Sequence, residues 1–167
     1  SRSVKCLGFV VAPEGIQPLQ KRVEQITTKE VDRTVKGIQS FLGIINYYKG
    51  FVPRLSEIAE PLTRLTRKGA DPSTEWGNEQ DAAVGRIKAA FSNDTVLTKY
   101  DPSRRILLQT DASSFALGAV LCHYSVDEEG KRTEYPICFA SRKMNEHQLN
   151  YSVTEKEGLA VLWAVEL

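Results

Sequence analysis

The chain has 167 residues, with 22 basic and 21 acidic side chains, 41% hydrophobic and 26% charged residues. That is the size of one ordinary domain or two small ones, and the composition excludes a disordered tail, a collagen-like rod and a disulfide scaffold. No apolar run reaches the ~18 residues of a membrane-spanning helix. Cys6, Cys122 and Cys138 form no CxxC pair, so we expect small buried side chains in an intracellular, reducing compartment.

The chain is expected to open with a strand and a short helix. Residues 4–11 are apolar and contain Gly8, which predicts a strand with a sharp bend. Pro13-Glu14-Gly15 follows as a turn, and a helix should begin at Pro18 because apolar residues then recur at helical spacing.

The middle of the chain is expected to be helical. Apolar residues at three- and four-residue spacing predict a helix over about 32–48. Pro61 cannot donate a backbone hydrogen bond to the preceding turn, so two short helical pieces should meet near Glu60. Residues 70–77 are expected to form a loop, and Asn78 is a candidate N-cap for a helix that ends near residue 91.

After residue 101 the apolar pattern changes to a period of two. It predicts strands over 106–112, 116–124 and 133–140, which would form a β-meander. Pro136 lies within the third strand, and proline is tolerated mainly at a sheet edge.

A final helix should follow the polar residues 141–150. Both Ser152/Glu155 and Thr154/Glu157 have the spacing of a capping box, so the sequence leaves the start of this helix open.

The near-neutral total charge hides a division along the chain. Residues 1–68 contain 12 Lys and Arg against 6 Asp and Glu, whereas residues 69–167 contain 10 against 15. A basic segment followed by an acidic one suits contact with a polyanion beside carboxylates that hold cations. Chance variation on two solvated surfaces is the alternative interpretation.

Two carboxylates are candidate metal ligands. Asp111 ends a predicted strand and Glu157 lies in the first turn of the last helix, and carboxylate oxygens suit Mg²⁺. The alternatives are a turn-forming Asp and a Glu that stabilises a helix N-terminus. Two-metal phosphoryl chemistry needs three or four carboxylates, and the remaining ones are not evident in the sequence.

Aromatic and basic side chains alternate across the second and third helical segments, as on a surface that follows a phosphate backbone and stacks on bases. Buried tyrosines beside a solvated fringe of basic residues are the alternative. The residues are Tyr47, Tyr48, Lys49, Arg54, Arg64, Arg67 and Lys68.

Several motifs together resemble reverse transcriptases of gypsy-like LTR retrotransposons. Those resembling the end of the palm and the thumb are Cys6-Leu7-Gly8-Phe9-Val10-Val11, Ser40-Phe41-Leu42-Gly43-Ile44-Ile45-Asn46-Tyr47-Tyr48-Lys49-Gly50-Phe51-Val52 and Ala59-Glu60-Pro61-Leu62-Thr63. Those resembling the start of the attached ribonuclease H domain are Thr110-Asp111-Ala112-Ser113, Gly118-Ala119-Val120-Leu121, Ala140-Ser141-Arg142 and Thr154-Glu155-Lys156-Glu157.

The resemblance implies roles for particular residues. Leu7, Gly8 and Phe9 match the primer-grip turn, and the helix that contains Tyr47 and Tyr48 matches a thumb helix beside the template–primer duplex. Lys49 and Arg54 follow that helix in the chain, and we expect their positive charges to bind the nucleic acid as well. Asp111 and Glu157 match the first two carboxylates that bind Mg²⁺ in the ribonuclease H domain, which cuts the RNA strand of RNA–DNA hybrids.

We therefore predict an α+β chain with a primer-grip-like hairpin (1–18), thumb and connection helices (19–100) and an incomplete β-β-β-α unit of a ribonuclease H-like domain (101–167). We expect binding to RNA–DNA hybrid or DNA/RNA template–primer, contact with the rest of the Pol polyprotein, no membrane, and no complete active site. A host-retained relic that serves as an interaction module is the alternative; an unrelated metal-dependent phosphodiesterase lacks its carboxylate set.

Overall fold

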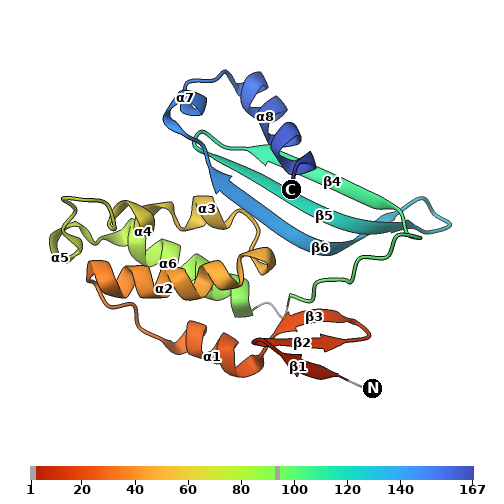
Figure 1. Cartoon of the computed structure of the whole chain (residues 1–167), viewed down its shortest axis with the longest axis horizontal. Helices are drawn as coiled ribbons and strands as arrows, with labels where there is room; N and C mark the ends of the chain where they lie inside the picture. Colours follow the sequence, from red (N-terminus) through yellow and green to blue (C-terminus); the bar gives the residue numbers. More distant parts are fainter. Residues whose placement is uncertain (1–2, 93–94) are drawn as a thin grey trace.

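The computed structural model describes residues 3–92 and 95–167, in which two three-stranded antiparallel sheets lie beside a group of helices (Figure 1). The expected α+β class is confirmed. The first sheet consists of β1 (Val4–Cys6), β2 (Phe9–Ala12) and β3 (Gly15–Pro18).

The N-terminal segment departs from the prediction in two ways. The expected strand over 4–11 is a hairpin, because Leu7 and Gly8 adopt φ values of 47° and 85° and reverse the chain between Cys6 and Phe9. Pro18 ends β3, where it pairs with Phe9, so the helix predicted from Pro18 begins two residues later.

The helical part follows the predicted order. It contains α1 (Gln20–Thr28), α2 (Val35–Tyr47), the 3-10 helix η1 (Lys49–Phe51), α3 (Leu55–Ile58), α4 (Glu60–Arg64), α5 (Pro72–Glu75) and α6 (Asn78–Ser92). Thr34 caps α2 by accepting a hydrogen bond from Gly37 N–H, and Pro61 lies in the first turn of α4, which confirms the break near Glu60. Part of the expected loop over 70–77 is α5, because the Asp71 side chain caps it.

The helices and both sheets share a hydrophobic core. Its fully buried side chains are Ile38, Phe41, Ile45, Val52, Leu62, Leu65 and Ile87. Phe9 from β2 and Phe139 from the second sheet pack against it. Burying each large apolar side chain contributes about 1.5–3 kcal/mol, so this core joins the two sheets to the helices.

The second sheet is the predicted meander of β4 (Ile106–Ala112), β5 (Ala116–Val126) and β6 (Arg132–Lys143). Pro136 lies in the edge strand β6, as expected for a residue without an N–H donor. The pairing with β5 shifts there, because Cys138 pairs with Leu121 while Pro136 pairs with Cys122. The sheet meets the helices through β6, which packs against α3 and η1 (Figure 1).

Two helices complete the structure, α7 (Glu146–Leu149) and α8 (Val153–Val165). Ser152 and Glu155 form the capping box of α8, which decides between the two starts that the sequence allowed. Helix α8 packs on β4 and β5, where Ala160 contacts Leu117 and Met144. Within the described residues, no helix combines the length and apolar character needed to cross a membrane.

The cysteines only partly match the expectation of small buried side chains. Cys122 is buried, but Cys6 and Cys138 are exposed, and all three are free thiols. Cys6 lies on the outer strand of the three-stranded N-terminal sheet, where little packs against it.

Candidate nucleic-acid interface and carboxylate site

The Leu7-Gly8 turn is fastened to the end of α2 by two tyrosines. Tyr47 Oη donates a hydrogen bond to the Leu7 carbonyl oxygen at 2.6 Å, and Tyr48 Oη donates one to the Gly8 carbonyl oxygen at 3.2 Å. A Cβ at position 8 would lie only 2.7 Å from Tyr48 Oη, so the turn needs glycine for space as well as for its positive φ.

A cluster of aromatic side chains packs beside this turn. Phe9 stacks on Tyr47 and Phe51 with ring centroids 5.5 and 5.7 Å apart, and meets Tyr48 edge-on at 5.2 Å. Such pairs add about 0.5–1.5 kcal/mol each beyond area burial. The cluster therefore holds the turn in one position relative to α2.

The two tyrosines differ in exposure, which corrects one sequence-based assignment. Tyr47 is 55% exposed and Leu7 81%, whereas Tyr48 is only 3% exposed. Burial raises the pKa of Tyr48, and the nearby Arg22 opposes that shift. Tyr48 is therefore a core residue that positions the turn, and its ring is not available to stack on a base.

A groove of about 580 Å³ runs between the turn, α1 and α2. It is lined by Leu7, Gly8, Arg22, Ser40, Gly43, Ile44, Tyr47 and Tyr48. Sequence reasoning missed Arg22 and Ser40 as lining residues, because only the packing of α1 beside the hairpin brings them to the groove. The helical spacing of Ser40, Gly43 and Tyr47 on α2 is the signal that could have indicated a shared face.

Lys49 lies outside this groove. As the first residue of η1 it is exposed and lines a separate cavity of about 370 Å³, together with Ser56, Thr63, Ser141 and Lys143. The basic side chain of the groove is therefore Arg22, and Lys49 lies on a different surface.

Arg54 makes ion pairs with two carboxylates. It caps α3 in a left-handed conformation with φ 53°, and its Nη2 lies 2.6 Å from Glu57 Oε2. Its Nη1 lies 3.3 Å from Asp111 Oδ2 on the second sheet. Here Arg54 joins the helices to the sheet.

Asp111 lies near the end of β4, on the sheet face that meets Arg54. Its register partner is Gly118. Because glycine has no side chain, the Arg54 side chain can lie against the strand at this position. The next pair, Ala112 and Leu117, belongs to the cluster packed under α8. Because successive strand residues alternate between faces, Asp111 and α8 lie on opposite sides of the sheet.

Glu157 lies in the first half of α8 and is half-buried. The neighbouring Lys156 fastens the start of this helix to the turn between β4 and β5 by donating a hydrogen bond from Nζ to the Ser114 carbonyl oxygen at 3.2 Å. Glu157 thus belongs to the α8 layer, whereas Asp111 faces the helices of the N-terminal half.

The donor chemistry of Asp111 suits a hard divalent cation. Its carboxylate is 54% exposed and already carries a cationic group, the Arg54 guanidinium. Across residues 3–92 and 95–167, however, no group of three or more His, Cys, Asp or Glu side chains is placed to hold a metal ion. Asp111 therefore fits as a single ligand, but the described residues do not assemble a complete two-metal site.

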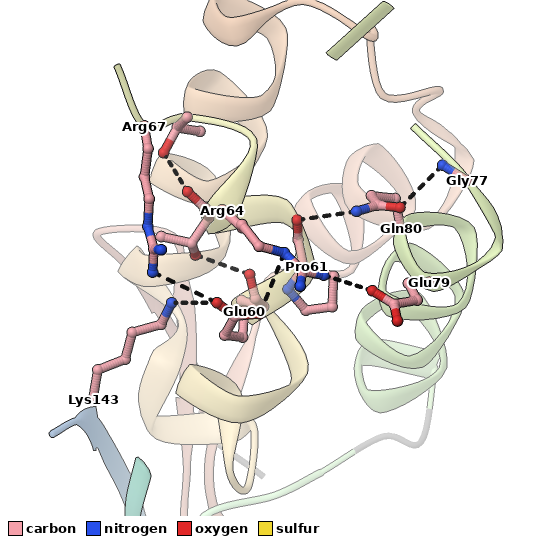
Figure 2. Close-up of polar contacts among 11 residues, drawn as sticks. Glu60, Pro61, Arg64, Arg67, Gly77, Glu79, Gln80 and Lys143 are labelled. Atoms are coloured by element: carbon pink, nitrogen blue, oxygen red, sulfur yellow. Dashed lines mark hydrogen bonds and ion pairs between the residues drawn. The ribbon is translucent and has the colours of Figure 1, made fainter. Parts of the chain in front are cut away.

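A second polar contact between helices and sheet centres on Glu60 (Figure 2). Lys143 Nζ, Arg67 Nη2 and Arg64 Nε lie 3.6, 3.7 and 3.9 Å from its carboxylate oxygens. Lys143 Nζ is buried and finds no hydrogen-bond partner among the residues that the structure describes. Burial lowers the pKa of Lys143, while the Glu60 carboxylate opposes that shift.

Comparison with known proteins points to one kind of protein. Residues 76–167 match the model of a family described as an RNase H-like domain found in reverse transcriptase. The Tf2-3 and Tf2-4 transposon polyproteins of Schizosaccharomyces pombe are each 36% identical to the chain over 159 residues, which is 95% of the chain but 12% of the polyprotein. The chain thus spans about an eighth of the length of these relatives.

Solved structures agree with the sequence relatives. A foamy viral protease-reverse transcriptase in complex with dsDNA superposes with a TM-score of 0.78 and 25% identity, covering 99% of this chain and 33% of that one. The same kind of protein in complex with an RNA/DNA hybrid gives a TM-score of 0.75 and 26% identity, covering 98% and 21%. The match includes the N-terminal hairpin and helices as well as the second sheet.

Proposed function

The chain belongs to the family of RNase H-like domains found in reverse transcriptases, and we propose that it binds template–primer nucleic acid as part of a retrotransposon polyprotein. The single observation that carries the proposal is the turn-and-groove surface, in which Tyr47 fastens the Leu7-Gly8 turn beside an open groove. In this proposal residues 1–18 form a primer-grip-like hairpin, 19–100 the thumb and connection, and 101–167 the first part of the ribonuclease H-like domain.

The groove supplies the groups that a nucleic-acid strand needs. The exposed Tyr47 ring and Leu7 side chain offer apolar faces to sugars or bases, and Arg22 offers a positive charge to a phosphate. The excess of six positive charges in residues 1–68 would attract a polyanion to this half of the chain. The matched foamy viral proteins are in complex with dsDNA and with an RNA/DNA hybrid, which supports the same ligand class.

We further propose that Asp111 belongs to the carboxylate set of the parent ribonuclease H-like domain, and that Glu157, which extends from the α8 side of the sheet, contributes to that set only in the longer parent protein. A divalent ion, Mg²⁺ in the proposal, would supply activated water and neutralise developing charge. In this chain Asp111 would offer one oxygen ligand, and Arg54 and Glu57 would fix the position of its carboxylate. With no group of three such ligands in the described residues, we expect little or no hydrolysis by this chain alone.

Fluorescence anisotropy with a labelled RNA–DNA hybrid tests the binding proposal. We expect binding that weakens as salt rises, because phosphate contacts release counterions. Arg22→Gln, which removes the positive charge that lines the groove, should weaken binding and reduce the dependence of affinity on salt by about one phosphate contact. Lys131→Gln, an exposed lysine in the β5–β6 turn, removes the same charge and should leave both unchanged. Equal losses in both variants would contradict a localised interface.

A cleavage assay with Mg²⁺ and the same hybrid tests the carboxylate proposal. We expect slow or undetectable release of RNA fragments. Rapid cleavage that Asp111→Asn abolishes would show a competent site and overturn the expectation of an incomplete one.

A further inference from the structure

A second cavity, of about 370 Å³, lies between α2, α3, α4 and the end of β6. It adjoins a different face of α2 from the turn-and-groove surface, and Gly43 is the residue common to both. The residues with polar side chains that line this cavity are Gln39, Asn46, Lys49, Ser56, Thr63, Thr66, Ser141 and Lys143.

The chemistry of this cavity suits an anion. Lys49 and Lys143 bring positive charge, two exposed amide side chains of α2 bring N–H donors, and no Asp or Glu is among the described residues that line it. Ser141 Oγ accepts a hydrogen bond from Ser56 N–H at 2.9 Å and donates one to Ser56 Oγ at 3.1 Å. The Ser56 hydroxyl proton therefore remains available to an acceptor such as a phosphate oxygen.

Lys143 has positive charge that its neighbours do not fully use. Its Nζ is buried and, over residues 3–92 and 95–167, has no hydrogen-bond partner. The Glu60 carboxylate lies 3.6 Å away, beyond hydrogen-bond distance, and also faces Arg64 and Arg67 (Figure 2). Since Arg64 pairs with Glu79 as well, three cations share two carboxylates. A buried ammonium in this state is costly, and an anion beside it would lower that cost.

We propose that this cavity binds a phosphate of the second strand of a nucleic-acid duplex whose first strand lies in the groove beside Tyr47, an inference that rests on the proposed binding of template–primer. Lys49 and Lys143 supply the positive charge, and Ser56 supplies a hydroxyl donor. The same contact gives a functional reason for an ammonium where an apolar side chain would be at least as stable.

The position of α2 between the two sites favours a duplex as the ligand. A helix with its side chains is about 10–12 Å across, and the grooves of a duplex are about 6–12 Å wide. The groove on one face of α2 and the cavity on another thus match the separation of two phosphate backbones. Gly43 has no side chain, and nothing lies within 4 Å of where its Cβ would be, so a duplex can approach the helix closely at this point.

Fluorescence anisotropy with a labelled RNA–DNA hybrid, and with each of its single strands, tests the inference on the intact chain. Lys143→Met should bind the hybrid about three- to tenfold more weakly and reduce its salt dependence by about one phosphate contact, although the melting temperature stays equal or rises. Lys49→Gln should weaken hybrid binding in the same way. Both variants should lose less affinity for a single strand, which can occupy the groove alone. Lys131→Gln, in the β5–β6 turn, should bind as the wild type does.

The possible results separate this inference from the proposed function. If Arg22→Gln weakens hybrid binding but Lys143→Met and Lys49→Gln do not, the groove is an interface and the cavity is not. If none of the three variants weakens binding, both proposals fail. Equal losses of Lys143→Met for hybrid and single strand would overturn the second-strand assignment.

Isothermal titration with inorganic phosphate distinguishes a duplex from a free anion as the source of the phosphate. We expect no binding at micromolar concentration, because a single phosphate lacks the contacts of the groove. Micromolar binding that Lys143→Met abolishes would assign the cavity to free phosphate and overturn its role in duplex binding.

Discussion

Tyr47 Oη donates a 2.6 Å hydrogen bond to the Leu7 carbonyl oxygen, forty residues away in the chain. This bond ties the end of α2 to the exposed turn of the N-terminal hairpin. The proposed nucleic-acid surface is thus made of two segments that local sequence does not bring together, and the hydroxyls of Tyr47 and Tyr48 join them.

Removal of that hydroxyl should loosen the turn. Tyr47→Phe keeps the ring stack on Phe9 but loses the hydrogen bond, so we expect a loss of about 0.5–1.5 kcal/mol in unfolding free energy by urea denaturation. Affinity for an RNA–DNA hybrid should fall as well. Tyr151→Phe removes a hydroxyl from a tyrosine that is 42% exposed and far along the chain, and should affect neither measurement.

Comparing Gly8→Ala with Gly130→Ala separates the stability cost of a positive φ from the cost of steric crowding. Both have positive φ, 85° and 81°, but a Cβ at Gly8 meets Tyr48 Oη at 2.7 Å whereas nothing lies within 4 Å at Gly130. Gly130→Ala should cost about 1 kcal/mol from conformation alone, and Gly8→Ala clearly more. Equal costs in thermal or urea unfolding would show that Tyr48 moves aside freely.

Within the ion-pair cluster around Glu60, we expect substitution of Glu60 and substitution of Lys143 to change the unfolding free energy in different ways (Figure 2). Glu60→Gln leaves the buried Lys143 ammonium without a carboxylate, so we expect a loss of about 1–3 kcal/mol in unfolding free energy. Lys143→Met removes the buried charge and should be neutral or stabilising. Glu79→Gln removes an exposed partner of Arg64 and should cost less than about 1 kcal/mol.

The pH dependence of stability should report Lys143. Burial lowers the pKa of Lys143 below its ordinary 10.5, so in the alkaline window below 10.5 the unfolded chain binds more protons at this position than the folded chain. The contribution of Lys143 to unfolding free energy therefore rises with pH across that window. Urea unfolding at several alkaline pH values should show this rise in the wild type, and Lys143→Met should lack it. If the unfolding free energy of Lys143→Met rises with pH just as in the wild type, another titrating group causes the rise.

The start of α8 offers a test at acid pH. Ser152→Ala removes the capping box and should cost about 1 kcal/mol at neutral pH, whereas Thr154→Ala, inside the helix, should cost little. Hydrogen bonds from the Ser152 hydroxyl and N–H lower the pKa of Glu155, so its contribution is present above its unfolded pKa and is lost as pH falls through the folded one. The difference between Ser152→Ala and the wild type should therefore shrink under acid conditions.

Much of the fold followed from the sequence because its signals are local. Helical spacing predicted α2, Pro61 predicted the break between α3 and α4, and the period of two predicted β4 to the residue. Each of these signals depends on hydrogen bonds and side-chain faces within one or two turns of chain. The same reasoning left the start of α8 open, because two capping boxes are equally compatible with local geometry.

Tertiary structure alone decided what the candidate functional residues contact. Sequence grouped Tyr47 with Tyr48, yet packing exposes one and buries the other. It grouped Arg54 with a basic surface, yet a left-handed backbone turns Arg54 onto Asp111. Burial and ion pairing depend on segments far apart in the chain, so a short pattern determines which element a residue occupies, and the packing of elements determines what its side chain meets.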